Sequence, residues 1–200
     1  MGRRSIKTQR RDDLIRACIQ TLHDDGWEGA SLARIAKRAG LSAGLVAHYF
    51  GDKAELMEAT MRHICFALWR RQADLLATAD SPARRLHALI AANLGSDQFS
   101  AETTAVWLSF WARVTHSKRL GRIHRITTAR LASNVRHALG ALLPRELPDR
   151  EAEIRRIGLG LAVLIDGLWL RAALGGISPT ETQALALSYV DAEFARLANR

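Results

Sequence analysis

Apolar residues recur along this 200-residue chain at intervals of three and four residues. No segment alternates between apolar and polar residues as a half-buried strand does. The first such stripe consists of Leu14, Ile15, Cys18, Ile19 and Leu22. Only four prolines interrupt the chain, and its abundant alanine, leucine and arginine favour helix. Because 200 residues are enough to bury a core of ordinary size, the spacing predicts a folded all-α protein.

Capping residues and glycines divide this pattern into about nine helices. Ser31, Ser42 and Asp52 each precede a periodic segment and can accept a hydrogen bond from its first turn. The residues Ser178-Pro179-Thr180-Glu181 form a capping box that opens the last helix. In chain order, the expected helices cover about 14–26, 31–40, 42–49, 53–79, 81–94, 100–115, 120–143, 149–174 and 178–200.

The chain is strongly basic, with a net charge of +9, which indicates a polyanionic partner, nucleic acid before anionic membrane. Residues 151–200 carry five basic and six acidic side chains, so this end is expected to face something other than DNA. Cys18 and Cys65 lie at apolar helical positions and are expected to be buried thiols. With no signal peptide and no span of about 20 apolar residues, we expect a soluble cytoplasmic protein.

The segment SLARIAKRAGLSAGLVAHYFGDK, from Ser31 to Lys53, has the residue types that a helix-turn-helix needs. Ala36 is small where two helices would cross, and Gly40 tolerates the positive φ of a tight turn. The apolar residues expected to lock the two helices together are Ile35, Leu41 and Val46. A second helix mounted in this way offers its outer face to the major groove of DNA. The alternative is a helical hairpin inside an all-α core with a solvated basic face.

Small residues on the second helix would let its backbone lie close to DNA, and His48 and Tyr49 can donate to phosphates or base edges. Lys53 can pair with a phosphate, and a basic N-terminal arm that includes Arg10 and Arg11 can reach phosphates or the minor groove. The expected DNA-binding residues are Arg3, Arg4, Lys7, Ser31, Ser42, Ala43, Gly44, Leu45, Ala47, His48, Tyr49 and Lys53.

The sequence SLARIAKRAGLSAGLVAHYFGDKAEL resembles the DNA-binding region of TetR-family transcriptional repressors. GLVAHYFGDKAELMEATMR, AVWLSFWA and LGLAVLIDGLWLRAALGG are similar to the choline-responsive BetI branch of that family. The resemblance implies an all-helical dimer that is not an enzyme, with a helix-turn-helix head at residues 1–53 and a ligand-binding and dimerisation body at residues 54–200. The family's reading helix typically carries a hydroxyl residue and a tyrosine where this chain has Leu45 and Ala47, which leaves His48, Tyr49 and Lys53 as the expected contacts.

Five residues of the body have the chemistry of a cation-binding cage. Trp107, Phe110 and Trp111 share one helical face, and Asp166 and Trp169 lie three residues apart. A quaternary ammonium group makes no conventional hydrogen bonds and is held by ring faces, each worth about 0.5–2 kcal/mol, and by a nearby carboxylate. The alternative is that the aromatic rings are ordinary core.

Asp166 is the only charged residue between Ile157 and Leu170, so we expect its carboxylate to be buried and to need a partner. The candidates are Arg113, His116, a residue across a dimer interface, or a cationic ligand.

The last two expected helices are the candidate dimer interface. The eighth is apolar nearly all round, and the ninth offers Leu185, Leu187, Tyr189, Val190, Phe194 and Leu197, so pairing with symmetry mates would form four helices. The expected function is a homodimeric repressor of betaine genes that binds operator DNA and responds to choline or a similar small cation, without cofactor or metal. The alternatives are an efflux or stress regulator sensing another lipophilic cation, a helical enzyme on a cationic substrate, and a non-specific nucleic-acid-binding module.

Overall fold

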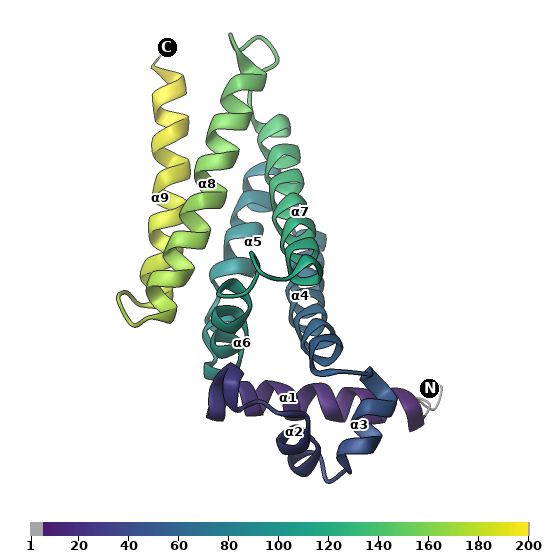
Figure 1. Cartoon of the computed structure of the whole chain (residues 1–200). Helices are drawn as coiled ribbons and strands as arrows, with labels where there is room; N and C mark the ends of the chain where they lie inside the picture. The colour runs from purple at the N-terminus through teal and green to yellow at the C-terminus, as the bar shows by residue number, and fades with distance from the viewer. Residues whose placement is uncertain (1–5, 200) are drawn as a thin grey trace. The chain divides into compact units, whose positions relative to one another are not determined.

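The computed structural model describes residues 6–199, and this part of the chain contains nine α-helices, one short 3₁₀ helix and no strand (Figure 1). The prediction of an all-α protein is confirmed. The helices are α1 (Ile6–Gly29), α2 (Leu32–Arg38), α3 (Ala43–Phe50), α4 (Lys53–Ala77), α5 (Pro82–Leu94), η1 (Ser96–Phe99), α6 (Ala101–Trp111), α7 (Lys118–Leu142), α8 (Arg150–Ala173) and α9 (Pro179–Ala198).

The described residues pack into two compact units. One contains residues 6–66 and 100–124, and the other contains residues 67–99 and 125–199. Both α4 and α7 therefore contribute to each unit. The boundary expected after Lys53 does not coincide with the limits of these units, and as a division of function it stays a prediction.

The first unit is built around α1, which packs against α2 and α6. Leu14 and Cys18 of α1, Ile35 of α2 and Val46 of α3 are all fully buried. Cys65 is buried as well, and both thiols are free, as expected. Apolar burial of these side chains, each worth roughly 1.5–3 kcal/mol, holds the short α2 and α3 in place.

Side-chain caps begin the helices where the sequence predicts them. The hydroxyl of Ser31 accepts from the backbone N–H of Arg34 at 3.2 Å, and that of Ser42 accepts from Leu45 at 3.3 Å. The carboxylate of Asp52 accepts from the N–H of Glu55 at 2.7 Å at the start of α4.

Two boundaries differ from the expected ones. The first helix begins at Ile6, eight residues before Leu14, and its regular part is interrupted at Gly26 as expected, because that residue has non-helical φ +66° and ψ −174°. The sixth helix ends at Trp111 rather than near Thr115, because the chain turns at residues 112–116. The 3₁₀ helix η1 carries no strong periodic signal and was not expected.

In the second unit, α8 and α9 lie side by side and antiparallel (Figure 1). A Cβ atom at Gly160 of α8 would overlap the hydroxyl of Tyr189, so a larger residue there would require the Tyr189 ring to move. The two helices are also joined by an ion-pair cluster, Glu153, Arg156, Glu193 and Arg196. No helix within residues 6–199 is long and apolar enough to cross a bilayer.

Candidate DNA interface and effector site

The turn between α2 and α3 has the geometry of a helix-turn-helix. Gly40 has φ +66°, a conformation that favours glycine, and the N–H of Leu41 donates to the carbonyl of Ala36 at 2.9 Å. Ion pairs then hold α2 against α1, with Arg34 3.0 Å from Asp25 and Arg38 2.6 Å from Asp24. The eight-residue α3 is thus joined by a tight turn to a helix that is itself paired with α1.

The α3 helix has an inward and an outward face. Val46 and Phe50 are buried, whereas His48 is exposed and Tyr49 is half-buried. The imidazole and phenol rings meet edge to face with their centroids 5.6 Å apart. The other predicted residues of this region are also accessible: Ser31, Ser42, Ala43, Gly44 and Ala47 are exposed, and Leu45 is half-buried. The predicted reading face thus presents small residues with two hydrogen-bonding rings at one end.

The predicted basic contacts differ in their environments. The ammonium of Lys53 is half-buried, donates to the carbonyl of Trp27 at 2.8 Å and lies 5.4 Å from the centroid of the Trp27 ring. Lys7 is exposed on α1. Arg3 and Arg4 lie outside the described residues.

The expectation of an arm reaching to Arg11 is wrong, because α1 begins at Ile6. Arg11 donates to the carbonyl of Tyr49 and stacks over the Phe50 ring at 4.2 Å. These two contacts make Arg11 part of the support of α3.

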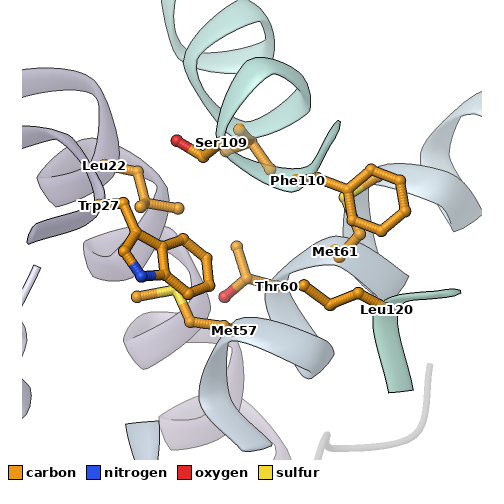
Figure 2. Close-up of a pocket in the computed structure, with 9 residues that line it drawn as sticks. Leu22, Trp27, Met57, Thr60, Met61, Ser109, Phe110 and Leu120 are labelled. Carbon is orange, nitrogen blue, oxygen red and sulfur yellow. The ribbon is translucent and has the colours of Figure 1, made fainter. Parts of the chain in front are cut away.

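The aromatic residues of α6 pack against one another. The rings of Trp107 and Phe110 meet edge to face at 5.7 Å, and Trp107 and Trp111 lie 6.1 Å apart. Trp107 and Phe110 are buried, and Trp111 is half-buried. Phe110 borders a cavity of only about 10 Å³, which Figure 2 shows between Trp27, Met57 and Phe110. This space accepts about one water-sized probe, far less than a trimethylammonium group needs.

The other two predicted effector residues belong to the second unit. Trp169 is buried, stacks on Phe99 at 6.1 Å and donates its indole N–H to the carbonyl of Gln98 at 3.2 Å. Asp166 is exposed, so the expected burial of its carboxylate is wrong. The α8 helix turns this position away from the interior, and periodicity could not reveal which face of a nearly all-apolar helix is covered.

Sequence reasoning missed Trp27, which lies at the end of α1 between two glycines. Its ring lies 4.2 Å from the guanidinium of Arg113, which also pairs with Glu28 at 2.8 Å. Lys53 contacts the same ring, as described above. Trp27 therefore links the residues after α6 with the start of α4, and the signal for it was only a lone aromatic residue at a helix end.

Comparison with known proteins agrees with this architecture. Residues 14–60 match the family model described as "Bacterial regulatory proteins, tetR family", and residues 82–195 match "BetI-type transcriptional repressor, C-terminal". A helix-turn-helix head joined to such a body defines a DNA-binding transcription regulator. The chain belongs to the TetR family, with a C-terminal region of the BetI type.

Curated relatives named "HTH-type transcriptional regulator BetI" cover nearly the whole chain. The protein from Burkholderia mallei is 44% identical over 198 residues, covering 96% of this chain and 95% of the relative. The one from Burkholderia ambifaria is 42% identical over 195 residues, with the same shares of both chains. These relatives are transcriptional regulators and not enzymes, as the resemblance implied.

Solved structures share the fold. A TetR transcription regulator from Haloarcula marismortui has a TM-score of 0.81 at 18% identity, covering 92% of this chain and 98% of that one. A candidate transcriptional regulator from Saccharomonospora viridis, solved in complex with choline, has a TM-score of 0.82 at 18% identity, covering 92% and 96%. At such identities the likeness concerns the fold alone.

Proposed function

We propose that this regulator represses transcription by binding operator DNA through the outer face of α3. The exposed imidazole of His48 and the accessible phenol of Tyr49 supply donors for base edges and phosphates. Ser42, Ala43 and Gly44 at the start of α3 let the backbone approach the duplex. Further phosphate contacts are proposed for Arg3, Arg4, Lys7 and Lys53. The region around Ser31 is proposed to contact a phosphate as well. Such a regulator would act in the cytoplasm, where the chromosome lies.

The proposed active form is a homodimer through α8 and α9. Leu159 and Val163 of α8 are 68% and 62% exposed, and Leu185 of α9 is 50% exposed. Exposed apolar side chains at helical spacing mark an interaction surface rather than a solvated one. A dimer places two reading helices on half-sites about 34–36 Å apart, so a small change in their separation lowers the affinity.

The proposed effector is a small quaternary ammonium cation such as choline, and the proposed targets are genes of betaine synthesis. The support is the BetI-type C-terminal match together with relatives of 44% identity that carry the BetI name. One structural neighbour binds choline. The proposed contacts in the first unit are Trp107, Phe110 and Trp111, whereas Asp166 and Trp169 of the second unit stay predictions from the sequence.

The small cavity beside Phe110 suggests how binding would be transmitted. Because it holds only about 10 Å³, a ligand against the α6 rings must displace side chains of that helix. Arg113, just beyond the end of α6, is bonded to Glu28 and stacked on Trp27. A shift of α6 would therefore pull on the end of α1, against which α2 and α3 are mounted.

The observation that carries the proposal is the combination, in one chain, of an exposed α3 reading face with a BetI-type body. Gel-shift titration against the promoters of neighbouring genes tests it. We expect sequence-specific binding that choline modulates. Binding without sequence preference, or turnover of choline without DNA binding, would contradict the proposal.

Three variants test the effector contacts. Trp107→Phe, Trp111→Leu and Asp166→Asn should weaken the choline response while leaving operator affinity within about twofold, because none lies on α3. Asp74→Asn, another exposed aspartate of the second unit, is the matched control and should respond normally. If all three variants respond like the wild type, the effector assignment is wrong.

A further inference from the structure

A second cavity of about 460 Å³ lies in the first unit, away from the small one beside Phe110. Its volume is within the range of about 300–1,000 Å³ typical of pockets for small ligands. Side chains from α1, α3, α4 and α7 line it. The lining residues are Arg11, Tyr49, Phe50, Glu55, Glu58, Ala59, Arg62, Arg119 and Arg122, and we call this site the arginine cleft.

The arginine cleft carries more positive than negative charge. Glu58 accepts two hydrogen bonds from Arg62, at 2.7 and 3.0 Å, and lies 3.6 Å from Arg119. Glu55 pairs with the same Arg119 at 3.3 Å. Two carboxylates thus compensate two of the four guanidinium groups.

The remaining two arginines have no carboxylate partner within the described part of the chain. Arg11 is bound to the carbonyl of Tyr49 and to the Phe50 ring, both of which leave its charge uncompensated. The side chain of Arg122 takes part in no hydrogen bond or ion pair among residues 6–199. The cleft therefore has an excess of two positive charges, which matches the charge of a phosphate dianion.

We propose that the arginine cleft binds a small phosphate-bearing anion. Guanidinium groups bind phosphate oxygens with two parallel N–H donors, and they prefer such oxyanions to a point charge like chloride. Tyr49, which is half-buried, offers an aromatic edge against which the rest of the ligand can lie. The charge of the cleft favours free anions whatever genes or effector the regulator serves.

The site has a direct connection to the reading helix. Arg11 holds the carbonyl of Tyr49 near the C-terminal end of α3, and the same side chain lines the cleft. An anion that recruits Arg11 would compete with this bond. Occupancy of the cleft is thus expected to alter the position of Tyr49.

Isothermal titration calorimetry of the full chain tests the proposal, with inorganic pyrophosphate as the probe and sodium chloride adjusted to constant ionic strength. We expect saturable binding by the wild type. Arg122→Ala should bind about tenfold or more weakly, because it removes a charge-assisted hydrogen-bond pair. Arg136→Ala, which removes an equal charge from an exposed position on α7 outside the cleft, should bind within about twofold of the wild type.

A variant that is expected to bind pyrophosphate more tightly controls for loss of binding through misfolding. Glu55→Gln removes one of the two carboxylates that repel the anion, so it should bind pyrophosphate several-fold more tightly. Absence of binding by the wild type, or equal losses in Arg122→Ala and Arg136→Ala, would overturn the proposal. So would a wild type that ignores pyrophosphate while Arg122→Ala weakens operator binding, since the cleft would then hold a phosphate of the DNA backbone.

Discussion

The helix pairs α2–α3 and α8–α9 are stabilised in different ways, although ion pairs join α2 to α1. The first consists of seven and eight residues and depends on buried Ile35 and Val46 and on a glycine turn. Within the described chain, no ion pair involves residues 42–50. The second consists of 24 and 20 residues joined by four interlocked charges. The ion pairs between α8 and α9 fix how one helix lies along the other. The polar groups of α3 make no such pairs and stay available for an outside partner.

The largest expected effect comes from the core beneath α3. Val46 is completely buried, so Val46→Asp places a carboxylate without a partner in an apolar site, at a cost of several kcal/mol. We expect fast hydrogen exchange throughout residues 32–50 and loss of operator binding. Ala47→Asp, at the exposed neighbouring position, should keep wild-type exchange and lose only operator affinity. Slow exchange at residues 32–50 in Val46→Asp would show that the pair is held by other contacts.

A smaller effect separates the roles of the two pairs. Ser42→Ala and Ser178→Ala each remove an N-cap, and each should lower the free energy of unfolding by about 1 kcal/mol in urea titrations. Only Ser42→Ala should also weaken operator binding, because it loosens the start of α3. Equal losses of operator affinity in both variants would contradict the assignment of DNA reading to α3.

The ion-pair cluster predicts a still smaller, pH-dependent effect. Hydrogen bonds from Arg156 lower the pKa of Glu193 from 4.5 to about 2 in the folded protein. Because the folded pKa is lowered, the stabilisation is full above about pH 4.5 and is lost as the pH falls toward 2.

Calorimetry measures this contribution directly. Glu193→Gln should lower the Tm by about 2 °C at pH 7, and the difference from the wild type should shrink below pH 4.5. Asp191→Asn, at an exposed position on the same helix as Glu193, should leave the Tm unchanged. A difference for Glu193→Gln that does not vary with pH would point to packing rather than charge.

The smallest expected effect is chemical. Burial raises the pKa of the Cys18 thiol to about 11, so at pH 8 it is protonated and covered. A disulfide reagent should modify neither thiol of the native protein on the time scale of minutes. In Val46→Asp, Cys18 should react faster, because α2, which packs against α1, belongs to the region that unfolds. Rapid reaction of Cys18 in the wild type would mean that the unit around α1 opens without any substitution.

Sequence reasoning succeeded for features encoded within one helical turn. The caps at Ser31, Ser42 and Ser178 and the positive φ of Gly40 were all predicted correctly. Burial of one face of an almost uniformly apolar helix was not predictable, and Asp166 was wrongly expected to be inside. The role of Trp27 was missed because its cationic neighbours, Lys53 and Arg113, are far away in the chain.

The amino-acid sequence by itself determined the all-α class and the helix-turn-helix, because apolar period, capping and turn chemistry act between residues only a few positions apart. The family followed from the resemblance of whole segments, not from this local chemistry. Only the tertiary structure decided which charges pair. Glu153 and Arg196 are 43 positions apart, and the arginine cleft collects side chains from four helices. Such encounters depend on how whole helices pack, and no local periodicity specifies which long side chains will meet.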